Sequence, residues 1–283
     1  MHTDTTTAAP ALQTRWADCE EDVRDAQRLR YRVFAQEMGA HLTPPEGTPS
    51  GLDADRFDAF CDHLLVRAVD PVHGTGPLIG TYRVLTPEAA LRAGGFYTDT
   101  EFDLAPLAPL RGRALELGRS CVDAQWRSGS VIMALWTALG QYMAQHGLDT
   151  MIGCASIGLD DQGTSAAQLW HRLCRTHLVE QRWRVAPRIA LPLHTQAHAD
   201  ANGAAAATCP QAPPLIKGYL RCGARLLGPP ALDVAFNTAD LPLMLRMHDV
   251  APRYRQHFFG MNFGVNVGVN VEMGSSVHSG ASA

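Results

Sequence analysis

Glu116 and Arg119 stand inside a short apolar segment, and side chains of these two types can do acid–base and anion-binding chemistry. The segment ALELGRSCV, residues 114–122, has the composition of a buried strand. Such a strand does not carry charges without a reason, because burying a charge is costly. A half-buried carboxylate with a raised pKa can serve as a general base, and a guanidinium can bind a carboxylate. The alternative is that the two residues only pair with each other inside the sheet.

The turn that follows this strand contains Arg127, Ser128, Gly129 and Ser130 and leads into a helix expected over 131–143. A strand, a turn of small residues and a helix N-terminus together direct backbone N–H groups at an anion or a carbonyl oxygen. A bulge or a splayed edge in the 114–122 strand is a second expected source of N–H groups that polarise a carbonyl. The segment therefore predicts a site for an anionic or carbonyl-containing group.

A second group of candidate residues lies earlier in the chain. His63 is the second candidate base, because its unperturbed pKa of about 6.5 suits proton transfer near neutral pH. Asp55, Asp58 and Asp62 are candidates to bind a substrate ammonium, with loop capping as the alternative. Arg83 joins the arginine of the apolar strand as a candidate ligand for a substrate carboxylate.

Composition narrows the classes of function. The net charge of −4 over 283 residues gives no basis for a nucleic-acid partner. The seven cysteines are scattered without CxxC spacing, which argues for reduced thiols and against a disulfide framework or a metal site. The chain has no apolar run of about 18 residues and no signal-peptide pattern at its start. We therefore expect a cytoplasmic α/β protein without a bound metal.

The elements that must position these residues follow from periodicity. A helix is expected over 20–38, and its four arginines (Arg24, Arg28, Arg30 and Arg32) are expected on a solvated face, with a partner-binding face as the alternative. A hairpin follows, with strands over 63–69 and 78–85. The central strand–helix pair precedes a second pair over 149–157 and 164–177, which predicts a mixed sheet with crossover helices.

The remaining segments complete a single domain expected over 15–260. Residues 215–237 are expected to form a strand, a turn and a strand, and ADLPLML a short helix. Residues 1–14 are expected to be disordered, 194–214 to form a mobile loop insertion, and 261–283 a low-complexity disordered tail. The mixture of cations and aromatics at 253–259 suggests a peripheral contact with an anionic membrane surface.

The order of elements resembles the GNAT acyltransferase fold, an α/β fold with a central mixed β-sheet flanked by helices. In that family the turn after the fourth strand reads R/Q-x-x-G-x-G/A and holds the pyrophosphate of coenzyme A. Arg127 matches this pattern, but Ser130 and Ile132 stand at the two glycine positions. A β-branched residue hinders close backbone approach, so coenzyme A is not the expected donor.

Four pairs of residues resemble the acyl-homoserine-lactone synthases, a GNAT branch that takes acyl groups from acyl carrier protein. The pairs are Arg30 with Phe34, Asp55 with Asp58, Gly80 with Arg83, and Glu116 with Arg119. The aromatic residue that those synthases place after the first helix is missing, with residues 38–40 in its place.

A closer resemblance, over residues 27–260, is to the L-ornithine Nα-acyltransferases of ornithine-lipid synthesis. It rests on the segments FDAFCDHLLV, LIGTYRVL, FYTDTEFDL, ELGRSCV, KGYLRCGARLLGPPALD and FNTADLPLML. The resemblance implies transfer of a 3-hydroxy fatty acyl group from acyl carrier protein to the α-amine of L-ornithine, giving lyso-ornithine lipid. The donor is then carried on phosphopantetheine, and no tightly bound cofactor is expected.

In this interpretation Glu116 is the first candidate for the general base and His63 is the second. The turn at 127–130 is expected to contact the pantetheine arm. An acidic carrier protein requires a basic docking face, for which Arg127 with Arg172 and Arg175, or the first-helix arginines, are candidates. Two alternatives remain. One is a synthase of another N-acyl amino acid or an acyl-homoserine lactone, and the other is a non-catalytic GNAT-like module that binds acyl carrier protein or lipid.

Overall fold

A mixed sheet forms the centre of the computed structural model, which describes residues 11–70, 74–193, 211–252 and 254–255. Within these residues eight strands join in the order β1-β2-β3-β5-β6-β10-β8, with β9 paired to β10. Only β5 and β6 run parallel among these paired strands. The strands are β1 (Leu12–Trp16), β2 (Asp62–Asp70), β3 (Gly74–Leu85), β5 (Ala114–Val122), β6 (Thr150–Gly158), β8 (Arg225–Leu226), β9 (Ala231–Asp233) and β10 (Thr238–Arg246). A separate short pair joins β4 (Phe102–Asp103) to β7 (Ala186–Pro187).

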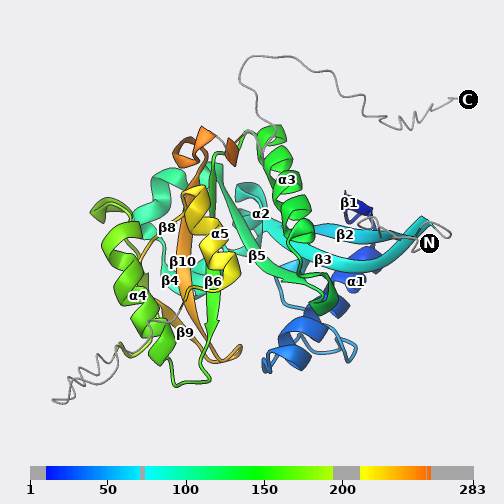
Figure 1. Ribbon diagram of the computed structural model, residues 1–283, viewed down its shortest axis with the longest axis horizontal. Helices are drawn as coiled ribbons and strands as arrows, with labels where there is room; N and C mark the ends of the chain where they lie inside the picture. Colours follow the sequence, from blue (N-terminus) through cyan, green and yellow to red (C-terminus); the bar gives the residue numbers. More distant parts are fainter. Residues whose placement is uncertain (1–10, 71–73, 194–210, 253, 256–283) are drawn as a thin grey trace, which may run out of the picture.

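Helices cover both faces of this sheet (Figure 1). They are α1 (Glu20–Tyr31), α2 (Pro87–Ala93), α3 (Ser130–Gln145), α4 (Thr164–His177) and α5 (Pro214–Cys222). Successive side chains of a strand point to opposite faces. Accordingly Leu64 of β2 packs in one core cluster with Leu135 of α3, whereas Leu65 packs in another with Leu29 of α1. The arrangement confirms the expected α/β class, with a mixed sheet between helices.

The strands β5 and β6 separate partway along their length. Their parallel pairing extends from Ala114 opposite Thr150 only as far as Glu116 opposite Ile152. On its other side, β5 carries an irregularity in its pairing with β3 near Arg119, whose φ is 50°. A positive φ at a residue other than glycine within an irregular register marks a β-bulge. Both devices expected from the sequence, a bulge and a splayed edge, are therefore present in this strand.

Three segments differ from expectation. The strand β1 takes in residues 12–14, assigned to the disordered N-terminus, because the segment pairs along β2. The segment LIKGYLRC forms α5 rather than a strand, with proline at the first helical position, where its missing N–H costs nothing. The segment ADLPLML lies in β10 rather than a helix. A strand buried on both faces reads as a continuous apolar run, which periodicity cannot distinguish from a buried helix.

Two further kinds of helix occur among the described residues. A π-helix (Arg32–Glu37) continues α1, and short 3₁₀ helices include Asp58–Phe60, Tyr97–Thr100, Ala105–Arg113, Ala124–Trp126, Gln181–Trp183 and Met247–Asp249. Most of the expected insertion and the whole of the expected tail lie outside the described residues, as do residues 253 and 256–259 of the expected membrane contact. Within the described ranges, no helix is both long and apolar enough to span a bilayer.

Candidate active site

A cavity of about 940 Å³ lies where β5 and β6 separate. Its wall includes residues 117–120 of β5, which directly follow the last paired residue of that strand, and residues 154–156 of β6, which begin two positions beyond the last paired residue there. On the face of the sheet that α1 covers, the cavity wall includes Tyr97 and Glu116. On the opposite face, the wall includes Trp136 of α3 and Tyr219 of α5. The cavity therefore passes through the sheet and offers a polar side and an apolar side.

Glu116 lies at the polar side of this cavity, buried at 4% exposure. Its carboxylate accepts hydrogen bonds from the backbone N–H of Tyr97 at 2.6 Å, the N–H of Thr98 at 2.7 Å and the hydroxyl of Thr98 at 2.6 Å. Burial raises the pKa of Glu116, although these hydrogen bonds oppose the rise. A buried carboxylate with a raised pKa, on the wall of a cavity, has the properties of a general base.

The alternative pairing of Glu116 with Arg119 does not occur in the structure. Arg119 forms ion pairs instead with Asp53 at 3.3 Å and Asp55 at 3.1 Å. Its guanidinium lies 5.0 Å from the ring centroid of Tyr97 and 4.5 Å from that of Phe236. These contacts hold Arg119 at the cavity wall, and among the described residues the Glu116 carboxylate has no ion-pair partner.

Arg119 belongs to a buried network that balances its own charge, which we call the arginine–aspartate network. Its members are Arg30, Arg83, Arg119, Asp53, Asp55 and Asp58. Arg30 is fully buried, at 2.8 Å from Asp53 and 3.0 Å from Asp58. The expected solvated position of Arg30 is therefore wrong, because the residue lies on the helix face that carries Leu29 and Val33 into the core.

The expected aspartate ligands for a substrate ammonium are placed elsewhere. Asp55 and Asp58 each lie 2.7 Å from Arg83, and the arginines around them lower the pKa of both carboxyls. Asp62 accepts a hydrogen bond from the Tyr142 hydroxyl at 2.5 Å. The residues that line the cavity include none of these three aspartates. Their carboxylates are engaged with groups of the protein, so the geometry does not support this prediction.

His63 is also absent from the cavity wall. The side chain is buried at 2% exposure, with Nε2 at 3.3 Å from the carbonyl oxygen of Asp58. Burial lowers the pKa of His63, with an opposing effect from Asp58. Because the imidazole does not reach the cavity, the structure does not support His63 as the base. By contrast, Arg83 and Arg119 both line the cavity, and their role as carboxylate ligands stays a prediction.

The predicted turn lies at another part of the cavity wall, at the start of α3. Gly129 precedes the helix with φ of 102°, a conformation that favours glycine, and it lines the cavity together with Arg127. Arg127 donates to the carbonyl of Val122 and pairs with Glu37 at 2.5 Å. Ser128 and Ser130 are exposed and do not contribute to the wall. The turn therefore meets the cavity through two of its four residues.

The sequence analysis missed a second group of acids, Glu101, Asp233 and Asp240, which we call the acidic cluster. Asp233 and Asp240 line the cavity, and the carboxylate of Glu101 lies close to that of Asp240. Asp240 is buried at 4% exposure near the start of β10. A lone acid in an otherwise apolar run was the signal available in the sequence, since apolar strands rarely carry one.

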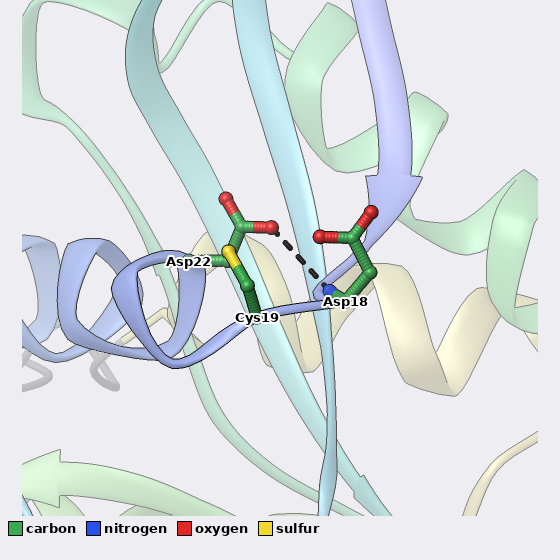
Figure 2. Close-up of side chains that lie close together, drawn as sticks. All are labelled: Asp18, Cys19 and Asp22. Carbon is green, nitrogen blue, oxygen red and sulfur yellow. Dashed lines mark hydrogen bonds between the residues drawn. The ribbon is translucent and has the colours of Figure 1, made fainter.

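Two groupings among the described residues have the composition of metal ligands. Asp18, Cys19 and Asp22 meet at the start of α1, where Asp22 accepts a hydrogen bond from the backbone N–H of Asp18 (Figure 2). Arg15 also pairs with Asp22 and lowers its pKa to about 2, so this grouping joins β1 to α1. The second grouping is Glu101, Cys154 and Asp240. Burial raises the pKa of Cys154 well above its usual value, which disfavours the thiolate that a metal would require.

Comparison with known proteins gives consistent matches. Residues 29–137 match the family model described as an acetyltransferase (GNAT) domain. An L-ornithine N(alpha)-acyltransferase of Agrobacterium fabrum (strain C58 / ATCC 33970) is 37% identical over 88% of this chain and 85% of its own length. A protein of the same name from Brucella abortus (strain 2308) is 38% identical over 88% and 89%. The crystal structure of the AHL synthase LasI matches with a TM-score of 0.49 and 14% identity, over 93% of this chain and 100% of that chain.

Proposed function

The chain belongs to the L-ornithine N(alpha)-acyltransferase family and is an N-acyltransferase, and from this premise we propose that it transfers a 3-hydroxy fatty acyl group from acyl carrier protein to the α-amine of L-ornithine. The product is lyso-ornithine lipid. The observation that carries the proposal is the position of Glu116, a buried carboxylate on the polar side of a cavity that crosses the sheet. An amine enters from that side, and a fatty chain lies against the apolar side.

The reaction requires the amine to become neutral before it attacks. Glu116 takes a proton from the α-ammonium, and the free amine attacks the thioester carbonyl carbon. The new C–N bond forms as the C–S bond breaks, and the attacking nitrogen loses a second proton, which the departing phosphopantetheine sulfur takes up to leave as a thiol. Backbone N–H groups on the unpaired edge of β5 beyond Glu116 stabilise the charge that develops on the carbonyl oxygen.

The cysteines of the cavity wall support direct transfer rather than an acyl-cysteine intermediate. Burial raises the pKa of Cys61 and Cys121 to about 12 and that of Cys222 to about 11, and it also raises the pKa of Cys154. A thiol with such a pKa is almost entirely protonated near neutral pH, and the thiolate is the nucleophilic form. The amine itself is then the attacking group.

The apolar side of the cavity supports a fatty acyl donor. It is formed by Trp126, Ile132, Met133, Trp136 and Leu215 among others. Ile132 takes a position where a coenzyme A site has a small residue, which favours a donor carried on a protein-bound pantetheine arm. Arg221 of α5 reaches the wall and gives it positive charge, which suits an acidic carrier protein, whereas Arg127 at the wall is paired with Glu37.

The test is turnover with defined donors and acceptors. The purified protein is incubated with 3-hydroxyacyl carrier protein and each of several amino acids, and the freed phosphopantetheine thiol is measured. We expect thiol release with L-ornithine, together with an N-acylated product of the matching mass. The same acyl group on coenzyme A is the control donor and should support a lower rate. Thiol release with another amine, and none with ornithine, would overturn the proposal.

A further inference from the structure

The acidic cluster of Glu101, Asp233 and Asp240 differs from the buried aspartates of the described chain that pair with arginine. Asp22, Asp53 and Asp58 each form an ion pair with an arginine. Within the described residues, no lysine, arginine or histidine forms an ion pair with a member of the acidic cluster. Buried carboxylates are stable only when a cation or hydrogen-bond donors compensate them.

Hydrogen bonds do not make up for the missing cations. Both carboxylate oxygens of Glu101 are buried, and they accept no hydrogen bond of good geometry from the described residues. Asp240, at 4% exposure, accepts one from the hydroxyl of Thr238 at 2.9 Å. Asp233 accepts one from the backbone N–H of Phe236 at 3.0 Å. Ser156 also stabilises the Asp240 carboxylate, and Tyr97 and Cys154 stabilise that of Glu101, so the cluster meets neutral donors but no cation among the described residues, at a place where the cavity admits a ligand.

The acidic cluster lies next to Glu116. The hydroxyl of Thr98 donates to the Glu116 carboxylate at 2.6 Å and lies 3.9 Å from the sulfur of Cys154. That sulfur lies within 4.8 Å of the nearest carboxylate oxygens of Glu101 and Asp240. The α-nitrogen and the distal nitrogen of an extended diamino acid lie roughly 6 Å apart by ordinary bond lengths. One such molecule can therefore place its first amine at Glu116 and its second at the acidic cluster.

We propose that the acidic cluster is the subsite for the distal ammonium of the acceptor and that Asp240 selects a diamino acid. The proposal rests on the proposed function, since it deepens the acceptor specificity of the same cavity. A bound ammonium supplies the missing positive charge and donates hydrogen bonds to carboxylates that lack them. The role that the sequence suggested for Asp55, Asp58 and Asp62 then belongs to acids that no arginine neutralises.

The experiment compares L-ornithine with L-norvaline, which has the same carbon chain without the distal amine. Binding to the wild type and to Asp240→Asn is measured by calorimetry, and kcat/KM by thiol release from 3-hydroxyacyl carrier protein. We expect the wild type to prefer ornithine by at least about 30-fold, the scale of hydrogen bonds to a charged group. Asp240→Asn should reduce this preference to near unity. Glu101→Gln is the second variant if Asp240→Asn does not fold.

Asp160→Asn is the matched control, because Asp160 is an exposed acid near the end of β6 that does not line the cavity. A preference for ornithine that survives in Asp240→Asn would overturn the inference, as would equal binding of the two amino acids to the wild type. Loss of the preference in EDTA and its return with Mg²⁺ or Mn²⁺ would show a metal site instead. If ornithine binding depends on Asp240 but no acyl group is transferred, the proposed function fails while the subsite stands.

Discussion

The arginine–aspartate network and the acidic cluster both contain three acidic residues, and they flank the same cavity with opposite electrostatic arrangements. In the network, Arg30, Arg83 and Arg119 match Asp53, Asp55 and Asp58 in number and pair with all of them. In the acidic cluster, Glu101, Asp233 and Asp240 have no cation among the described residues.

The difference separates groups that position other residues from groups that bind. A carboxylate already paired with an arginine has little left to offer a ligand, but it holds that arginine in place at the cavity wall. An uncompensated carboxylate costs stability in the free protein, and a cationic ligand recovers that cost on binding. Residues that serve binding are commonly unfavourable for stability for this reason. Glu116 lies between the two groups, in the field of Arg83 and bonded to Thr98.

Breaking the network should give the largest effect on stability. Arg30→Met removes the fully buried partner of Asp53 and Asp58, and we expect a loss of about 3–5 kcal/mol in the free energy of unfolding, because two buried carboxylates lose their shared cation. Urea unfolding measures the change. Arg24→Met on the exposed face of α1 is the control and should stay within about 0.5 kcal/mol. Equal stability of the two variants would show that the network is not a structural unit.

Substitution of Glu116, which lies between the two groups, should have the largest effect on the rate of acyl transfer. Glu116→Gln keeps the shape of the side chain but removes the base, so we expect kcat to fall at least about 100-fold, the scale of general-base catalysis. The rate of thiol release is measured together with ornithine binding, which should change little. Near-normal turnover in the folded variant would assign the base elsewhere. Recovery of the rate at high pH, where the amine is already neutral, would support the assigned role.

The pH dependence of stability should separate the two groups. Burial and the charges of Asp240 and Asp233 raise the pKa of Glu101 to about 9, with Tyr97 and Cys154 as the other titratable neighbours. The unfolded glutamate loses its proton near pH 4.3, so between these values the folded state holds a proton that the unfolded state lacks. Stability then falls as the pH rises, by at most about 1.4 kcal/mol per pH unit.

In the arginine–aspartate network the stability depends on pH in the opposite direction. The lowered pKa values of Asp55 and Asp58 contribute stability above the unfolded value near 3.9, and this contribution is lost as the pH falls further. Urea unfolding between about pH 2 and pH 9 checks both limbs. Glu101→Gln should flatten the alkaline limb and leave the acid limb unchanged, with Asp160→Asn as the control. An unchanged alkaline slope in Glu101→Gln would contradict the burial of an uncompensated acid there.

The smallest expected effect is the stability of Asp240→Asn in the absence of ligand. Removing the charge of Asp240, which burial disfavours, should raise the free energy of unfolding by about 1 kcal/mol or less, which corresponds to an increase of about 2–4 °C in Tm for a chain of this size. Differential scanning fluorimetry at pH 8 measures it. A marked decrease instead would place Asp240 among the residues that stabilise the fold. Added ornithine should raise the Tm of the wild type more than that of the variant.

The sequence predicted the strand over 114–122 and the helix over 164–177 with the bounds that the structure has. Their apolar patterns come from local burial, which is visible in a single segment. It also singled out Glu116, Arg83 and Arg119, since a charge in an apolar strand is conspicuous wherever the strand folds. It did not distinguish α5 and β10 from their alternatives, because a short apolar run fits either a buried strand or a buried helix.

Only the tertiary structure decided which residues far apart in the sequence contact one another. Arg30 and Asp58 stand 28 positions apart and Glu101 and Asp240 much farther, so the sequence gives no measure of which acid meets which arginine. The sequence therefore determined which side chains can do chemistry and the strand that carries Glu116. The packing of the loop before β2 against α1 and β3 decided that Asp55 and Asp58 pair with arginines, whereas Asp240 meets no arginine among the described residues. The cost of a buried charge depends on neighbours that only the fold supplies.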